Sequence, residues 1–398
     1  MNKKKSIVFI GAIGFPYGLA AIQKAILISK CLILKGNTVT AVCEQGIHNE
    51  KEYPDLKPVG TFENINYVYT SGTPFRTENF VKRNYLKAKG AVGVFFLLRK
   101  MKKNDNLDVV ILSIRSFPAI FYFFLLSKLF GFKTVLNYVE YYSKIKKRKF
   151  QISRKLNDLF RDKYGLLFVD AVFPISEFLI NHIKEVSPKK RYLKIPGLTD
   201  FDRYEGIDIS EGDKYFLFCG DAGYRDVIEF IIDSFNILPD KSTYLYLVIN
   251  GTEQNKSEVK KYINESAKKE KIKFFSKLPE KKLFSLYKNA IGLLIPLRPT
   301  FQDIARFPHK TGEYMASGNP VISTQYGEIK YYFRDMENIL LAKDYDINLF
   351  ADKMQFVIDE PEIAQKIGIK GKEIGMRLFD YRYQAEEMDY FLDGLFNN

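Results

Sequence analysis

Short apolar runs alternate along the chain with longer stretches in which apolar residues recur three or four positions apart. The short runs are typical of buried strands, and the longer spacing is typical of helices that cover a sheet. Regular alternation of the two predicts parallel α/β sheets, because a helix is the usual connection between parallel neighbouring strands. The expected fold class is therefore α/β.

Two successive series of strands are expected. The first comprises residues 7–10, 39–43, 67–69, 109–113, 134–139, 172–175 and 193–195, and the second comprises residues 215–219, 244–249, 273–275, 291–297 and 321–324. Pro196-Gly197 separates the series, so we expect doubly wound lobes at residues 1–197 and 198–378, followed by an amphipathic helix at residues 379–398. In such sheets ligands bind at the carboxyl ends of the strands, so a ligand site between the lobes is expected.

We expect neither a signal peptide nor a transmembrane helix. The apolar run at residues 7–10 is short and followed by glycines, as in a first strand. No run reaches the ~18 apolar residues of a membrane span. Cys31, Cys43 and Cys219 lie in apolar runs without paired spacing, which predicts buried thiols, a cytoplasmic protein and no zinc site.

The positive charge is concentrated in the first half of the chain. Residues 1–200 contain 34 Lys and Arg against 15 Asp and Glu, whereas residues 201–398 contain 27 against 32. Basic clusters lie at 82–103 and 144–149, and the first flanks the apolar run 92–98, a composition suited to an anionic membrane interface. Because no nucleic-acid-binding motif accompanies this charge, we expect peripheral attachment to the cytoplasmic membrane face and no nucleic-acid partner. A merely Lys-rich surface remains the alternative.

The most informative segment is Phe-Pro-His-Lys-Thr-Gly-Glu-Tyr-Met-Ala-Ser-Gly-Asn-Pro-Val-Ile-Ser-Thr at residues 307–324. A loop that enters a helix presents unpaired N–H groups and the positive end of the helix dipole, which suit a phosphate. Lys310 adds a positive charge there, and the carboxylate of Glu313, about one turn into the helix, can accept hydrogen bonds from a ribose. The segment predicts a nucleotide diphosphate site, although an ordinary helix–turn–strand would have the same punctuation.

This segment resembles the donor motif of the retaining glycosyltransferases of family 4, the glycogen-synthase-like enzymes. Further resemblances lie in the first loop at residues 11–18, in the strand, helix and hinge of residues 175–201, and in residues 218–226. The resemblance implies a GT-B fold with two Rossmann-like lobes that face a central cleft. It also implies that the first lobe binds the acceptor, the second lobe binds the nucleotide sugar, and the helix at residues 379–398 crosses back to the first lobe.

By resemblance, several residues are expected to bind the donor: Gly18, Gly220, Arg225, Phe307, Pro308, His309, Lys310, Thr311 and Glu313. Two positions depart from the family pattern. Asp221 replaces the usual Arg of the diphosphate clamp, and Ala305 replaces the first Glu of a Glu-x7-Glu pair. Either Asp303 substitutes for that Glu, or the chain belongs to the branch with a Phe-Pro-x-Lys motif and only the second Glu, which we favour.

On the acceptor side, Arg115 and Glu140 follow strands of the first lobe and are expected to face the cleft. Arg115 would bind an anionic acceptor and Glu140 would supply a carboxylate, unless either forms a structural ion pair. The resemblance implies same-face displacement, in which Arg225, Lys310 and helix dipoles stabilise the departing diphosphate, with Glu140 completing the catalytic set. The sequence lacks an Asp-x-Asp motif, so neither a metal nor a cofactor is expected.

The expected function is a retaining hexosyltransferase that moves a sugar from a UDP- or GDP-sugar to a hydroxyl. The acceptor would be lipid-linked or a saccharide, in cell-surface polysaccharide assembly. Two alternatives remain: a nucleotide-sugar epimerase, although the chain is poor in His, and a catalytically silent basic module that binds membrane or nucleic acid. A dehydrogenase is disfavoured because the loop Gly-Ala-Ile-Gly-Phe-Pro-Tyr-Gly at residues 11–18 matches the dinucleotide fingerprint poorly.

Overall fold

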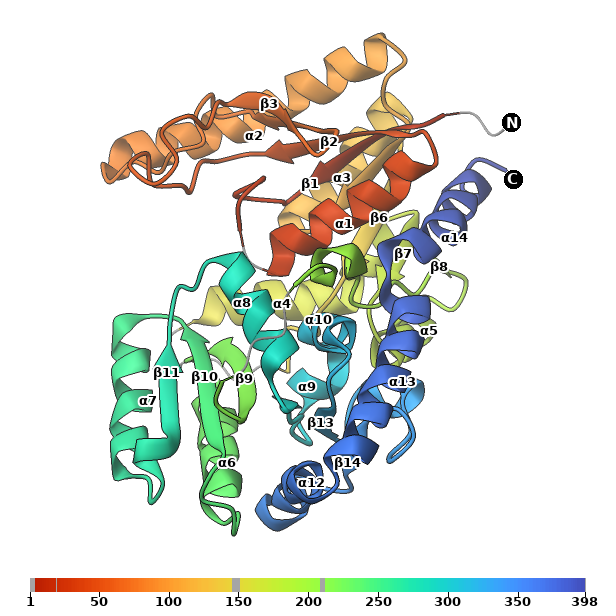
Figure 1. Ribbon diagram of the computed structural model, residues 1–398. Helices are drawn as coiled ribbons and strands as arrows, with labels where there is room; N and C mark the ends of the chain where they lie inside the picture. The colour runs from red at the N-terminus through yellow and green to blue at the C-terminus, as the bar shows by residue number, and fades with distance from the viewer. Residues whose placement is uncertain (1–3, 19, 145–150, 208–211, 398) are drawn as a thin grey trace. The chain divides into compact units, whose positions relative to one another are not determined.

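Residues 4–18, 20–144, 151–207 and 212–397 are described by a computed structural model (Figure 1). The chain divides into two units, each with its own sheet. Unit 1 consists of Met1–Leu198 and Tyr381–Asn398, and unit 2 consists of Thr199–Asp380. Of the basic cluster expected at residues 144–149, residues 145–149 lie outside the described residues.

Unit 1 is built on a sheet with the strand order β3-β4-β2-β1-β5-β6-β7-β8, parallel throughout except for the antiparallel pair β3–β4. Its strands are β1 Ser6–Ile10, β2 Thr38–Cys43, β3 Val59–Phe62, β4 Ile65–Tyr69, β5 Val109–Leu112, β6 Lys133–Tyr138, β7 Ala171–Pro174 and β8 Arg191–Tyr192. The expected strand at residues 193–195 is wrong in position. Strand β8 lies directly before these residues. The backbone N–H groups of Leu193 and Ile195 nevertheless donate hydrogen bonds to carbonyl oxygens of strand β7.

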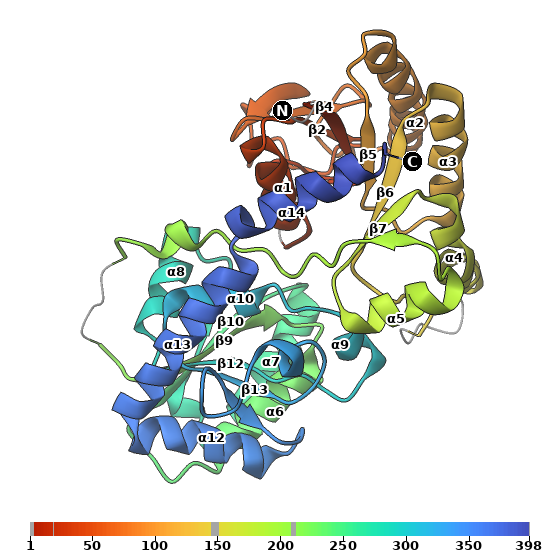
Figure 2. The same cartoon turned by 90° about the vertical axis from the view of Figure 1, so that its right-hand side faces the viewer.

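Helices cover this sheet and carry much of the unit's charge. They are α1 Ala20–Leu34, α2 Phe80–Lys103, α3 Phe117–Phe130, α4 Ile152–Tyr164, the 3-10 helix η1 Gly165–Phe168, α5 Glu177–Val186 and α14 Tyr381–Gly394. Figure 2 shows α14 alongside α1, and the two helices pack together. The ammonium of Lys5 contacts the carboxylates of Asp389 at 3.1 Å and Asp393 at 2.6 Å, so buried ion pairs join α14 to the start of the interior strand β1. The C-terminal helix is thus part of unit 1.

Unit 2 contains an entirely parallel sheet with the order β11-β10-β9-β12-β13-β14. Its strands are β9 Tyr215–Asp221, β10 Tyr244–Asn250, β11 Ile272–Phe275, β12 Gly292–Ile295, β13 Val321–Thr324 and β14 Leu340–Ala342. Its helices are η2 Phe201–Tyr204, α6 Arg225–Asn236, α7 Glu253–Glu265, η3 Lys269–Lys271, α8 Glu280–Asn289, α9 Phe301–Ala305, α10 Lys310–Ser317, α11 Ile329–Tyr332, α12 Ile347–Asp359 and α13 Pro361–Phe379. Strand side chains such as Phe216, Leu245 and Ile322 are fully buried, which explains the apolar runs in the sequence.

Within the described part of the chain, no helix has both the length and the apolar composition that crossing a membrane would require. The apolar helix α3 of unit 1 begins after a Ser116 cap and ends before Gly131, whose φ of 70° is left-handed. Its side chains Ile120, Phe123 and Leu126 pack into the interior.

Candidate functional site

Helix α10, which begins at Lys310, is fixed beside the carboxyl end of strand β9. The hydroxyl of Tyr314 accepts a hydrogen bond from the backbone N–H of Cys219 at 2.9 Å, joining the second turn of the helix to the strand. At the other end, Gly318 adopts a left-handed φ of 82° and caps the helix. The side chain of Asn319 then donates to the carbonyls of Tyr287 and Lys288 at 2.8 Å each. These contacts hold the start of α10 at the sheet edge where ligands bind in doubly wound folds.

Lys310 supplies a stable positive charge at this helix start. Burial alone would lower its pKa, but the net shift of the Lys310 pKa is upward because the Cys219 thiol and the carboxylates of Glu313 and Asp221 are close. The ammonium is therefore protonated at neutral pH. A cation and the positive end of a helix dipole coincide here, which is the electrostatic arrangement that suits an anionic ligand.

Glu313 lies one turn into α10 beside a group of aromatic side chains. Its Oε2 accepts a hydrogen bond from the hydroxyl of fully buried Tyr287 at 3.4 Å. Burial raises the pKa of Glu313, while Lys310 and Arg203 act in the opposite direction. Because an ionised carboxylate can accept several hydrogen bonds, Glu313 retains capacity for ligand hydroxyl groups.

The loop before α10 packs on an aromatic cluster. Phe307 is buried, with its ring 5.0 Å from that of Phe379 and 5.7 Å from that of Tyr332. Pro308 and His309 are partly exposed, and His309 occupies the N-cap position without a side-chain capping bond. Phe307 thus anchors the loop, while the two residues after it lie nearer the surface.

Thr311 is fully buried rather than surface-exposed. Its backbone N–H donates to the carbonyl of Pro308 at 3.0 Å, and its Oγ1 has no hydrogen-bond partner among the residues that the structure describes. The hydroxyl of Thr199 lies against the next residue: a Cβ added to Gly312 would be 2.2 Å from Thr199 Oγ1. The predicted contact between Thr311 and the donor remains a prediction.

The loop from β9 to α6 contains the other predicted donor residues. Asp221, which replaces the usual Arg, accepts a hydrogen bond from the N–H of Gly223 at 2.8 Å and so stabilises the turn after Gly220. Arg225 forms ion pairs with Glu229 at 2.5 Å and Glu258 at 3.2 Å, and its side chain is half exposed. Two carboxylates already compensate this guanidinium, so we expect it to bind phosphate more weakly than Lys310 does.

Two arginines near this loop were not predicted from the sequence. Arg298 forms a two-bond ion pair with Asp303, with Nε–Oδ2 at 2.7 Å and Nη2–Oδ1 at 2.9 Å, and also contacts Asp226 at 2.7 Å. Arg306 donates to the hydroxyl of Tyr224. The only sequence signal was their place: Arg298 lies three residues after strand β12, and Arg306 directly precedes the Phe-Pro-His-Lys motif.

The pairing of Asp303 bears on the missing first Glu of the family pattern. Asp303 is buried, and both of its carboxylate oxygens accept hydrogen bonds from Arg298. A carboxylate engaged in this way is poorly placed to contact a sugar. The arrangement favours the interpretation in which Glu313 is the only carboxylate of the Glu-x7-Glu pair that this chain retains.

The residues expected on the acceptor side, Arg115 and Glu140, lie at the carboxyl edge of the unit 1 sheet. Arg115 forms a two-bond ion pair with fully buried Asp158, with Nε–Oδ1 at 2.9 Å, and its guanidinium lies 4.4 Å from the Tyr142 ring centre. Asp158 raises the pKa of Arg115, and Glu140 contributes in the same direction. The backbone carbonyl of Glu140 accepts a bond from Arg161 at 3.2 Å. The structure therefore brings these residues together and gives Arg115 a structural ion pair.

Gly18 is exposed just before α1, where an added Cβ would lie 2.4 Å from Ile22 Cγ1. It belongs to unit 1 with Arg115 and Glu140, whereas the other predicted donor residues belong to unit 2.

Residues 203–374 match the family model "Glycosyl transferases group 1". No curated protein sequence matches the chain significantly. Among solved structures, sucrose-phosphate synthase from Thermosynechococcus elongatus is 18% identical, covers 99% of both chains and has a TM-score of 0.77. HepE from Anabaena in complex with UDP-glucose is 12% identical over 96% of this chain and 99% of its own, with a TM-score of 0.66. WaaG, a glycosyltransferase involved in lipopolysaccharide biosynthesis, is 14% identical over 98% of this chain and 100% of its own, with a TM-score of 0.64.

These structural matches share the GT-B fold, as expected from the sequence. Residues 203–374, which lie in unit 2, are thus similar to group 1 glycosyltransferases, and the whole chain shares the GT-B fold with these structures.

Proposed function

We propose that the protein is a retaining hexosyltransferase that uses a UDP- or GDP-sugar as its donor. The observation that carries this proposal is the pairing of Lys310 with the start of α10, followed one turn later by Glu313. The diphosphate would contact the ammonium and the helix start, and the ribose hydroxyls would donate to the carboxylate. HepE, a protein of the same fold, has been solved with UDP-glucose, which supports a nucleotide-sugar donor here.

In the proposed reaction the acceptor hydroxyl attacks the anomeric carbon from the face that the diphosphate leaves. The bond between the anomeric carbon and the phosphate oxygen breaks, and the acceptor proton passes to that departing oxygen. Negative charge grows on the diphosphate, so Lys310 and the dipole of α10 stabilise the transition state more than the ground state. Arg225 and Glu140 are proposed to assist from the β9–α6 loop and the acceptor side, and no metal is required.

We propose a lipid-linked or saccharide acceptor in cell-surface polysaccharide assembly, and a cytoplasmic enzyme attached peripherally to the membrane. Helix α2 supports the attachment because it buries only Gly90, Val94 and Leu98 among its described residues and exposes apolar and basic side chains.

A second exposed apolar surface, called the α3–α4 patch, consists of Phe121, Leu125, Leu129, Ile152, Leu156, Leu159, Phe160 and Leu167. Arg154, Lys155 and Lys163 share helix α4 with it. Apolar side chains among basic ones are typical of surfaces that bind anionic lipid.

The reaction is tested by incubating the protein with single UDP- and GDP-sugars and a lipid or oligosaccharide extract, with and without EDTA. We expect release of one nucleoside diphosphate, an equal rate in EDTA, and a product whose anomeric configuration matches that of the donor in the proton NMR spectrum. An inverted product would contradict retention, and dependence on a divalent cation would contradict the metal-independent mechanism. Absence of release with every donor would favour the catalytically silent alternative.

A further inference from the structure

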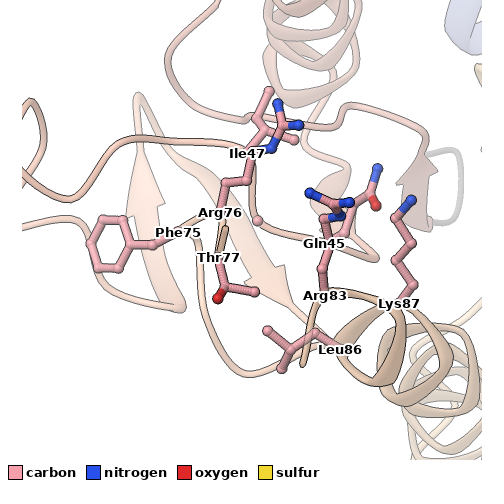
Figure 3. Close-up of a pocket in the computed structure, with 9 residues that line it drawn as sticks. Gln45, Ile47, Phe75, Arg76, Thr77, Arg83, Leu86 and Lys87 are labelled. Carbon is pink, nitrogen blue, oxygen red and sulfur yellow. The ribbon is translucent and has the colours of Figure 1, made fainter. Parts of the chain in front are cut away.

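A pocket of about 300 Å³ opens at the end of strand β2 in unit 1 (Figure 3). Its walls come from the segment after β2, the loop before α2, and the first two turns of α2. The lining residues are Gln45, Gly46, Ile47, Phe75, Arg76, Thr77, Arg83, Leu86 and Lys87.

The floor of the pocket is a pair of backbone segments that run side by side. His48 and Phe75 form a parallel bridge, in which the N–H of His48 donates to Pro74 O at 3.1 Å and the N–H of Arg76 donates to His48 O at 2.9 Å. A Cβ at Gly46 would lie 2.4 Å from the carbonyl carbon of Pro74, so no side chain fits between the segments. Backbone hydrogen bonds thus hold Arg76 in place on one side of the pocket.

Helix α2 forms the opposite side and is held just as closely. A Cβ at Gly90 would lie 1.7 Å from the carbonyl oxygen of Glu44, so the helix backbone packs directly on the segment after β2. At its start, the Asn79 side chain accepts a hydrogen bond from the N–H of Lys82 at 2.9 Å. Arg83 and Lys87 are one turn apart on this helix, and Figure 3 shows their side chains extending side by side.

The charges of the pocket are all positive. Arg76, Arg83 and Lys87 line it, and its lining contains no Asp or Glu. Among the residues that the structure describes, none of these three side chains forms an ion pair with a carboxylate. Like charges held near one another repel, and a bound anion would relieve that repulsion. The guanidinium groups also offer paired N–H donors that match a phosphate.

The pocket also lies at the edge of the sheet where an acceptor is expected. Strands β1 and β2 are parallel neighbours, so their carboxyl ends meet at one edge. The imidazole Nε2 of His48 lies 2.8 Å from the carbonyl oxygen of Gly14, which joins the pocket floor to the loop after β1. An anionic group in the pocket would therefore lie beside the first loop of unit 1.

We propose that this pocket binds a phosphate group carried by the acceptor, so that the acceptor of this enzyme is a phosphorylated sugar or a phosphate-bearing lipid. The inference rests on the proposed function, and it adds the chemical class of the second substrate. Arg76, Arg83 and Lys87 act by binding and orientation and take no part in bond breaking. The phosphate of a soluble sugar phosphate and that of a lipid headgroup present the same chemistry to these three side chains.

The test measures binding of glucose 6-phosphate and of glucose to the full chain by calorimetry. Vesicles of phosphatidylglycerol or phosphatidylcholine are tested in parallel by flotation. The pocket variant is Arg76→Ala/Arg83→Ala, and Arg99→Ala is the matched control because Arg99 is an exposed basic residue further along the same helix. A second variant, Thr77→Asp, leaves all three cations in place and puts a carboxylate in the pocket. Nucleotide binding at unit 2 is measured on every variant, so that failure of the donor site is recognised separately.

We expect glucose 6-phosphate but not glucose to bind, with an affinity that falls at least roughly tenfold in both pocket variants and stays within about twofold in Arg99→Ala. Binding of phosphatidylglycerol vesicles alone, with the same dependence on the variants, would also support the proposal and identify a lipid as the phosphate source. Equal binding by wild type and pocket variants, an equal loss in Arg99→Ala, or no binding of any phosphate probe would overturn it.

Discussion

Lys310 and Glu313 are the residues on which the donor site depends, and their roles follow from their surroundings. Both are charged groups in a partly buried place, where charge is costly unless it is compensated. The Lys310 pKa is raised by its acidic neighbours, whereas burial raises the pKa of Glu313 despite two nearby cations. A carboxylate kept at a cost to stability is typical of a functional position.

Glu313→Gln should therefore stabilise the fold and weaken donor binding. The pKa of Glu313 in the folded state lies above its ordinary value of 4.5. Ionisation of Glu313 therefore lowers the free energy of unfolding at pH values above the folded-state pKa, and this loss is absent below pH 4.5. We expect the free energy of unfolding to rise by ~1 kcal/mol at pH 8 with no gain near pH 4, measured by urea unfolding. Nucleotide affinity should fall roughly tenfold. Exposed Glu265→Gln is the control, and unchanged affinity in Glu313→Gln would contradict a ligand role.

Lys24 gives a second residue-scale prediction. Its side chain is buried in α1, and its Nζ has no hydrogen-bond partner in the described part of the chain. Burial lowers the pKa of Lys24 from 10.5 to about 7. The unfolded chain therefore binds the proton more tightly, and stability rises as the pH increases from about 7 to 10.5. We expect Lys24→Met to raise the free energy of unfolding by about 3 kcal/mol at pH 6, and by much less above pH 10.5. The same gain at both pH values would show that charge burial is not the cause.

At the level of elements, the sequence predicts those whose signals are local. Helix α10 ends at Gly318 and is followed by Pro320 and an apolar strand, and each of these signals is contained in a few residues. Strand β3 was missed because Gly60 interrupts a run whose side chains are largely exposed, and β14 was missed because a strand of three residues makes too short an apolar run. Strand β8 was misplaced for the same reason.

The residues of the candidate site likewise divide into those predicted from local sequence and those placed only by tertiary packing. Lys310 and Glu313 are neighbours on one helix, so their spacing alone predicts that they act together. Partners distant in sequence could not be predicted: Arg115 pairs with Asp158, and Phe307 packs on Phe379, only because tertiary packing brings their elements together. Asp303 was left with two alternatives because its pairing with Arg298 depends on how the loop after β12 folds back.

Asp303→Asn tests whether this loop is held by the ion pair or faces the donor sugar. Both partners are largely buried, so loss of the carboxylate should lower the free energy of unfolding by about 2–3 kcal/mol. Asp226→Asn, which removes the exposed partner of Arg298, should cost less than ~1 kcal/mol. Nucleotide affinity and transfer rate should change only a few-fold in both variants. A loss of transfer of roughly a hundredfold with intact folding would instead assign Asp303 the role of the missing Glu.

At the scale of the whole molecule, the excess positive charge and the family match fall in different parts of the chain. The family match covers residues 203–374 of unit 2, whereas the excess of Lys and Arg falls in residues 1–200. The proposed donor site thus rests on the start of helix α10 in unit 2, whereas the partners of unit 1 are inferred from the surface and the pocket of that unit. The α3–α4 patch and the basic pocket are two separate features of that unit.

Membrane attachment through the α3–α4 patch predicts a specific loss. Leu156→Ser/Leu159→Ser should reduce the fraction of protein that floats with phosphatidylglycerol vesicles, with the partition constant falling roughly tenfold. Ile363→Ser on α13 is the control because Ile363 is 46% exposed in unit 2, close to the 50% of each leucine. Raising the salt concentration should weaken binding of the wild type as the basic residues are screened. Equal flotation of the wild type and the patch variant would rule out this surface.

The most direct test of the central claim is a calorimetric titration of UDP, GDP and ADP into wild type, Lys310→Met and Lys288→Met. Lys288 is a matched control because it is also half-buried and donates to Ser317 O at 3.1 Å, at the opposite end of α10. We predict that one nucleotide binds the wild type and Lys288→Met with similar affinity, and binds Lys310→Met at least roughly tenfold more weakly. Equal affinity in Lys310→Met, or no binding of any nucleotide to the wild type, would contradict the donor site at the start of α10.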